Sequence, residues 1–209
     1  MPKSNDYRFV SDWQVSGKIE DVFRILQDVE RLPIWWPSVY LTVKELDKGH
    51  SGGIGRKIDL HTRGWLPYTL KWQMTIEEVE YPHHIALTAE GDLQGKGVWH
   101  LKQVGEHVHL RYDWHVQANK GLIKKLSPIL KPVFAMNHRW AMKQGETSLK
   151  LELQRLQAKS MSEALQIAEP PGPESTAKTV AIMGGSLALL GALVWLASRK
   201  GKHRSDDIA

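Results

Sequence analysis

One segment, residues 97–116, constrains the fold most, because its pattern predicts a β-hairpin of defined register. In GVWHLKQVGEHVHLRYDWHV, apolar and polar residues alternate on both sides of Gly105-Glu106. A two-residue turn with glycine first makes Val104 face His107. This register places large apolar side chains on one face: Trp99, Leu101, Leu110, Tyr112 and Trp114. The other face is polar and carries His100, Lys102, His107, His109, Arg111, Asp113 and His115.

The remaining periodicity in residues 1–157 predicts an α+β domain with helices on one face of an antiparallel sheet. Alternating or apolar runs predict further strands at 7–15, 39–46, 54–61, 70–77 and 85–89. Apolar residues at three-to-four spacing predict a helix at 19–29, which Ser16 can cap, and a long final helix from about residue 121. Residues 161–168 are expected to prolong that final helix.

The uncharged segment 179–198, TVAIMGGSLALLGALVWLAS, predicts a single-pass transmembrane helix. As a helix it would span about 30 Å, the hydrocarbon thickness of a bilayer. Lys178 precedes it, and four basic residues follow it in the short tail. The expected organisation is a folded domain at 1–157, a proline-containing linker at 158–178, the transmembrane helix at 179–198 and a basic tail at 199–209.

Two rules give opposite predictions for the side of the membrane on which the domain lies. The basic tail favours a cytoplasmic C-terminus, but the domain would then need export, and the first thirty residues contain no signal peptide. Because only eleven residues follow the apolar segment, insertion after synthesis and a cytoplasmic domain are expected.

Small residues would also allow two copies of this helix to pair as a homodimer: Gly184, Ala188 and Ala192 on one face, Ala181 and Gly185 on another.

Composition and motifs exclude several classes of function. Without cysteine the chain has no disulfide, iron–sulfur cluster, thiolate zinc site or cysteine nucleophile. The net charge of +5 is below that of a dedicated nucleic-acid binder, so no nucleic-acid partner is expected. A dinucleotide-binding glycine fingerprint, a P-loop, a zinc-protease helix and a hydrolase nucleophile elbow are all absent from the sequence. No cofactor is therefore expected.

Three segments in this order resemble the START-like, or Bet v 1-like (SRPBCC), superfamily, and within it the bacterial polyketide cyclase/dehydrase and lipid-transport group. They are EDVFRILQDVERLPIWWPSV (residues 20–39), GKGVWHL (95–101) and NHRWAMKQGETSLKLEL (137–153). The resemblance covers roughly residues 7–157. It implies a helix-grip fold, in which an antiparallel sheet curls around the last helix and leaves an apolar cavity. It implies no universal catalytic residue, because the superfamily includes lipid carriers, quinone binders, hormone receptors and cyclases.

Candidate ligand contacts lie on two walls of this expected cavity. The stripe of the long helix that faces the sheet contains Asn137, Trp140, Gln144 and Ser148, and the first three are candidate contacts. The opposite wall is the apolar sheet face, with Trp72, Met74, Trp99, Tyr112 and Trp114. Water-facing positions for the amides and core packing for the aromatic residues are the alternatives.

Trp35 and Trp36 lie between Pro33 and Pro37, in a connection that the resemblance places near the mouth of the cavity. Aromatic side chains there would gate entry or touch a bilayer interface. Alternatively, they fix the connection onto the core.

Few residues of the sequence are candidates for acid/base catalysis or for metal binding. Asp59 and His61 share one face of a predicted strand and form the only conceivable catalytic pair in the sheet. Histidines of the hairpin could chelate a metal, but they share a wet face with Lys102 and Arg111, so no metal site is expected.

Three functions remain open from the sequence. The expected one is a membrane-tethered module that binds or transfers a hydrophobic small molecule: a lipid, a quinone or an isoprenoid. The alternatives are a cyclase/dehydratase-like enzyme that uses the same cavity and a non-enzymatic regulatory domain with a filled interior. The volume and lining of the cavity distinguish the three.

Overall fold

The computed structural model describes residues 5–119 and 121–174. The predicted transmembrane helix at 179–198, the basic tail at 199–209 and the small residues considered for homodimer contact lie outside the described residues. No helix in the described part of the chain has both the length and the apolar character needed to cross a bilayer. Residues up to 173 belong to one compact unit.

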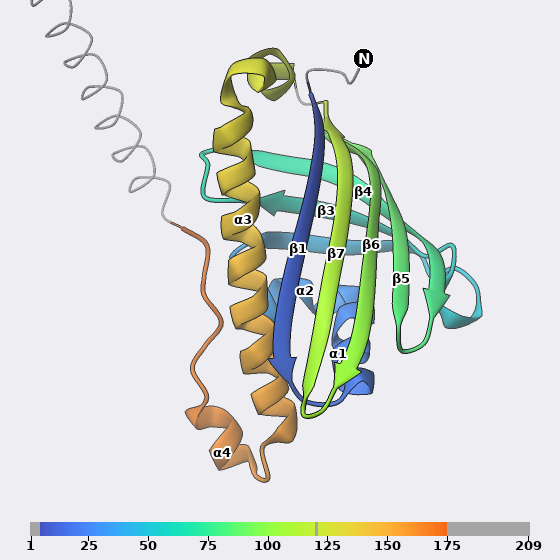
Figure 1. Ribbon diagram of the computed structural model, residues 1–209, viewed down its shortest axis with the longest axis vertical. Helices are drawn as coiled ribbons and strands as arrows, with labels where there is room; N and C mark the ends of the chain where they lie inside the picture. Colours follow the sequence, from blue (N-terminus) through green and yellow to red (C-terminus); the bar gives the residue numbers. More distant parts are fainter. Residues whose placement is uncertain (1–4, 120, 175–209) are drawn as a thin grey trace, which may run out of the picture. The chain divides into compact units, whose positions relative to one another are not determined.

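A curved antiparallel sheet forms most of this unit (Figure 1). Its order is β1-β7-β6-β5-β4-β3-β2, so the first strand pairs with the last. The strands are β1 (Asp6–Ser16), β2 (Tyr40–Asp47), β3 (Lys57–Arg63), β4 (Thr69–Glu80), β5 (His84–Gly91), β6 (Leu93–Val104) and β7 (His107–Ala118). Along the strands buried and exposed residues alternate, as a sheet with one covered face requires.

Helices cover the concave face of the sheet, and the longest runs beside β1 (Figure 1). The helical elements are α1 (Ile19–Gln27), the short turn η1 (Val29–Arg31), α2 (Leu32–Trp35), η2 (Ser51–Gly53), α3 (Gly121–Gln157) and α4 (Met161–Gln166). An antiparallel sheet followed by a long helix fits the predicted helix-grip fold within the α+β class.

The register of the β6–β7 hairpin is the one predicted from its alternation. Val104 pairs with His107, and Trp99 pairs with Tyr112. Gly105 has a φ of +58°, which suits a glycine at the first position of a tight turn. The hairpin therefore presents its aromatic face to the interior, where it forms one wall of the site.

Two predictions about helix ends are wrong. The residue before α1 is Lys18, and its side chain makes no capping bond. Instead, the Ile19 N–H donates to Oε1 of Gln103 at 2.8 Å, so a neighbouring strand supplies the cap that Ser16 was expected to give. The final helix ends at Gln157, and α4 is a separate helix, because the Ser160 hydroxyl accepts from the Glu163 N–H at 3.1 Å and starts a new first turn.

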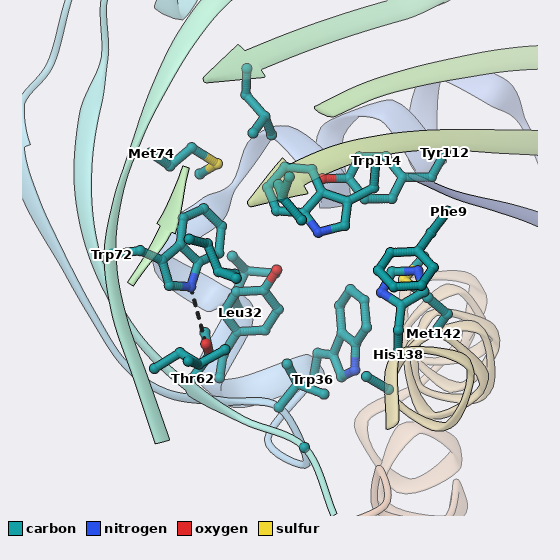
Figure 2. A pocket seen from close by; sticks show the side chains of 18 of the residues that line it. Phe9, Leu32, Trp36, Thr62, Trp72, Met74, Tyr112, Trp114, His138 and Met142 are labelled. Carbon is teal, nitrogen blue, oxygen red and sulfur yellow. Dashed lines mark hydrogen bonds between the residues drawn. The ribbon is translucent and has the colours of Figure 1, made fainter. Parts of the chain in front are cut away.

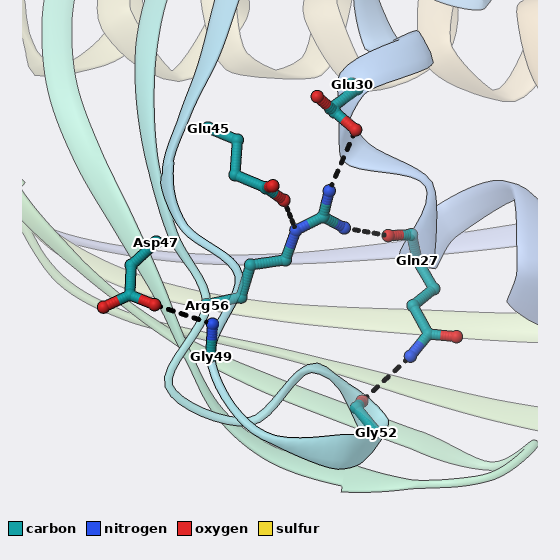
Figure 3. Close-up of polar contacts among 7 residues, drawn as sticks. All are labelled: Gln27, Glu30, Glu45, Asp47, Gly49, Gly52 and Arg56. Atoms are coloured by element: carbon teal, nitrogen blue, oxygen red, sulfur yellow. Dashed lines mark hydrogen bonds and ion pairs between the residues drawn. The ribbon is translucent and has the colours of Figure 1, made fainter.

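Arg56 ties the β2–β3 hairpin to the segment between α1 and α2 (Figure 3). Its guanidinium pairs with Glu45, reaches Glu30 at 3.3 Å and donates to the Gln27 carbonyl oxygen at 3.2 Å. The Gln27 side chain in turn donates to the Gly52 carbonyl oxygen at 3.0 Å. These bonds fix the connection that carries α2, whose residues line the cavity described next.

Candidate functional site

A cavity of about 200 Å³ lies between the concave sheet face and the helices (Figure 2). It exceeds the engineered apolar cavity of about 150 Å³ that binds benzene, so it has room for a ligand with at least one ring. Its walls come from the sheet, from η1 and α2, and from the middle of α3. Aromatic and aliphatic side chains make up most of the lining.

The structure brings most of the predicted contact residues to this cavity. They are Trp35, Trp36, Trp72, Met74, Trp99, Tyr112, Trp114 and Asn137. Trp140 and Gln144, in contrast, are not among the lining residues. The reason is the rotation of α3: its buried stripe runs through Met142, Gly145 and Leu149, which leaves Trp140 and Gln144 to one side.

Trp35 and Trp36 belong to the core rather than to an exposed loop. Their exposed fractions are 1% and 4%, so neither ring can touch a bilayer surface. Trp36 packs edge-on against Trp13 at 5.5 Å and against Tyr40 at 5.2 Å between ring centroids. It also lies against α3, where a Cβ on Gly145 would be 2.3 Å from its ring. The two tryptophans therefore fix α2 onto the core and form the inner wall of the cavity.

An aromatic stack on β6 and β7 forms the opposite wall. The Tyr112 ring lies nearly parallel to Trp99, with centroids 4.3 Å apart, and to Trp114, with centroids 5.6 Å apart. Trp72 on β4 contacts Trp114 at 5.9 Å. Such rings bury large apolar areas and move little, so this wall is a rigid surface against which a planar or branched apolar ligand can pack.

Two of the polar groups beside the cavity are already used by the protein. The Trp72 indole N–H donates to the Thr62 hydroxyl at 3.0 Å (Figure 2). Oδ1 of Asn137 accepts from the Leu66 N–H at 3.2 Å, which ties the loop after β3 to α3. Each bond engages one acceptor atom, so Thr62 and Asn137 help to hold the walls of the cavity together.

His138 is a lining residue that the sequence did not single out. Its ring stacks on Phe9 with centroids 4.1 Å apart, and Nε2 lies 3.4 Å from the Ser11 hydroxyl oxygen. Burial, together with the nearby Arg139, lowers the pKa of His138 from 6.5 to about 4. The imidazole is therefore neutral at physiological pH and adds no charge to the site.

Four of the five tyrosines of the chain line the cavity, and only Tyr112 was predicted. Burial raises the pKa of Tyr112 well above its ordinary value, and the neighbouring Tyr40 raises it further. Burial also raises the pKa of Tyr40 and, with Tyr7 as a second cause, that of Tyr68. These three phenols thus remain protonated at physiological pH and can donate hydrogen bonds.

Asp59 and His61, the candidate catalytic pair, do not reach the cavity. On β3 the buried residues are Ile58, Leu60 and Thr62, so Asp59 and His61 lie on the outer face. Nε2 of Gln73 donates to Asp59 at 3.3 Å on this face. Among the described lining residues there is no carboxylate, and Arg63 is the one side chain with a permanent charge.

The histidines of the hairpin also lie on the outer face. His107, His109 and His115 are exposed on β7, and His100 is exposed on β6. In the described ranges of the chain no three metal-ligating side chains come close enough to hold an ion. These histidine side chains therefore do not line the cavity.

The sequence model of the family described as polyketide cyclase / dehydrase and lipid transport matches residues 8–160. The chain belongs to this family. No curated protein matches the chain in sequence.

Solved structures share the fold of this family member at low identity. A START superfamily protein from Mycobacterium smegmatis has a TM-score of 0.59 and 14% identity, over 71% of this chain and 98% of its own. The Zhui aromatase/cyclase from Streptomyces sp. R1128 has a TM-score of 0.55 and 15% identity, over 74% of this chain and 97% of its own. Similarity at this level shows a common fold.

Proposed function

We propose that this domain binds an apolar small molecule, such as a lipid, a quinone or an isoprenoid, in the cavity between the sheet and α3. The observation that supports this most is the open volume of about 200 Å³ within an aromatic lining. Interiors that serve stability alone are packed at close to crystal density. A regulatory domain with a filled interior would not contain such a space.

The test is to measure ligand binding by the full chain. Apolar molecules that co-purify with it would be identified by mass spectrometry, and binding would be titrated with 1-anilinonaphthalene-8-sulfonate. Ala141 lines the cavity, so Ala141→Phe would fill it and reduce binding by about tenfold or more. Ala86 alternates with the inward-facing Ile85 and Leu87 of β5, so Ala86→Phe is a matched control that should bind normally. A chain that purifies without an apolar molecule and does not bind the probe would overturn the proposal.

Membrane attachment is the second part of the proposal. The uncharged residues 179–198 are supported as an anchor by their length and by the basic residues on both sides. Removal of residues 179–209 should move the chain from the membrane pellet to the supernatant after a carbonate wash. The domain is expected on the cytoplasmic side, where protease should reach a tag at Met1 only in inside-out vesicles. The opposite protection pattern would reverse the proposed orientation.

A cyclase- or dehydratase-like reaction in the same cavity is a second candidate, and its support is His138. This imidazole borders the cavity in its neutral form, as a general base requires. With a pKa of about 4, however, it is a weak base at physiological pH, and no carboxylate in the described lining could assist it. Binding that survives in a His138→Phe variant, with no loss of any measured turnover, would remove this candidate.

A further inference from the structure

The short helix α4 exposes its apolar side chains, although the residues at its start specify a helix. The Ser160 hydroxyl accepts from the Glu163 N–H at 3.1 Å, and the Glu163 carboxylate accepts from the Lys159 N–H at 2.8 Å. This reciprocal pattern is close to a capping box, which begins a helix at a defined residue. No residue of α4 is buried, however. Met161 and Leu165 are 76% and 78% exposed.

Met161 and Leu165 lie on one face of α4, because residues four apart in a helix point to the same side. In Figure 1 α4 lies beside the lower end of α3, on the side away from the sheet. A helix of six residues has little stability of its own, and most helices in proteins are stabilised by packing of their apolar face. This face of α4 lacks such packing and is open to a partner outside the folded domain.

The chain that follows α4 holds this face near the bilayer if residues 179–198 are the anchor. The Arg155 guanidinium donates to the Ala168 carbonyl oxygen, which fastens the segment after α4 to the end of α3. The eleven residue steps from Ala168 to Thr179, where the uncharged segment begins, span at most about 40 Å. The 37 residues of α3 measure about 55 Å along the helix. An upright domain must therefore turn α4, and not the start of α3, toward the membrane.

The charges around α4 indicate what kind of contact it can make there. Residues 158–174 contain one lysine and three glutamates. Attraction to anionic lipid headgroups needs clustered basic residues, so it cannot hold this surface on a membrane. Apolar burial remains, and the boundary between headgroups and acyl chains accepts the apolar face of a helix that lies in its plane.

We propose that Met161 and Leu165 of α4 insert into the headgroup–acyl boundary of the bilayer. The contact is a second attachment besides the anchor, and it fixes which end of the domain faces the lipid. This inference rests on the membrane attachment in the proposed function, because it assigns to α4 the surface that meets the same membrane.

Single nitroxide labels test the contact directly, since the chain has no cysteine that would compete for the label. Met161→Cys and Leu165→Cys place the label on the apolar face. The controls are Gln166→Cys, exposed on another side of the same helix, and Val10→Cys, 52% exposed on β1. The full chain is reconstituted at one copy per phosphatidylcholine nanodisc. Electron paramagnetic resonance then compares relaxation by oxygen, which concentrates in lipid, with relaxation by nickel(II) ethylenediaminediacetate, which stays in water.

The ratio of oxygen to nickel relaxation at Met161→Cys and Leu165→Cys should exceed the ratio at both controls by about threefold or more. Adding Met161→Gln to the chain labelled at Leu165→Cys should lower the ratio, because a polar group on the shared face opposes insertion. Replacing a third of the lipid by phosphatidylserine should not raise it, because the contact is apolar.

The other outcomes separate this inference from the attachment on which it rests. If the ratio is the same at all four labelled positions, or if Met161→Gln leaves it unchanged, the inference is overturned, whereas pelleting of the chain with membranes keeps the attachment. A ratio that rises with phosphatidylserine would replace apolar insertion by an electrostatic contact and overturn the inference too. Weak relaxation by both reagents at Met161→Cys and Leu165→Cys would mean that protein covers the face, which again overturns it. A chain that leaves the membrane pellet in a carbonate wash would refute the attachment itself.

Discussion

The hydroxyl of Tyr112 lies across the backbone of Gly97, and a Cβ atom on this glycine would be only 2.3 Å from the phenol oxygen. Gly97 pairs with Trp114 on the next strand, and its absent side chain leaves the space that both rings use. A glycine in the middle of a strand normally weakens it. Here it leaves room for the Tyr112 and Trp114 side chains in the wall of the cavity.

Gly97→Ala should therefore displace Tyr112 from its place. We expect a loss of about 1–3 kcal/mol in the free energy of unfolding, because the methyl group overpacks the core, together with weaker binding of 1-anilinonaphthalene-8-sulfonate. Chemical denaturation followed by tryptophan emission measures the first, and equilibrium dialysis the second. Gly172→Ala is the control, since nothing lies within 4 Å of its Cβ position. Equal stability of the two variants would show that Tyr112 does not depend on Gly97.

Gly145→Ala should be destabilising, although the same change in an exposed helix stabilises by about 1 kcal/mol. The new methyl group would lie 2.3 Å from the Trp36 ring. We expect a loss of about 1–3 kcal/mol by denaturation. A double-mutant cycle with Trp36→Phe supplies the control, because the smaller ring makes room for the methyl group. Simple additivity of the two changes would contradict the proposed contact.

The free energy of unfolding should decrease as the pH is lowered, because the pKa of His138 in the folded chain, about 4, lies below its ordinary value of 6.5. Between these values the unfolded chain binds a proton that the folded chain does not. The stabilisation is therefore complete above pH 6.5 and is lost progressively toward pH 4, by up to about 3 kcal/mol. Denaturation at a series of pH values should show a smaller slope in His138→Phe. An unchanged slope in His138→Phe would refute the prediction.

Gln103 should contribute to stability more than its exposed position suggests. Its Oε1 caps α1 through the Ile19 N–H, while Nε2 donates to the carbonyl oxygens of Gly17, at 3.1 Å, and Gly105, at 2.8 Å. We expect Gln103→Ala to cost about 1–2 kcal/mol in denaturation, the usual effect of losing a helix cap. Gln14→Ala, on the exposed face of β1, should cost less than about 0.5 kcal/mol. Equal effects would mean that the cap is replaced by water.

Local alternation was enough to predict the β6–β7 hairpin and hence the aromatic wall of the site. The rotation of α3 was not predictable in the same way, because a charged residue, Glu152, occupies its buried stripe. Glu152 is accommodated by Arg31, whose guanidinium lies 2.6 Å from its carboxylate, and this partner is far away in the sequence. Gly145 in the helix interior was the available signal of a close approach.

The tyrosines of the edge strands were missed for another reason. Whether Tyr7 and Tyr40 face inward depends on which strands pair and on the bulge between Tyr40 and Thr42, and neither property is local. Both tyrosines therefore reach the cavity lining only once the strand pairing of the whole sheet is in place.

The pairing of β1 with β7 has a consequence for how this chain acquires its structure. Asp6 finds its partner Gln117 only after nearly the whole sheet has been made, so the first strand leaves the ribosome long before it can be paired. Contacts so distant in sequence slow folding, because a long loop must close first. Until then the side chains of Tyr7 and Trp13, which are buried in the finished fold, lack the partner strand that covers them, and β1 exposes an unpaired edge.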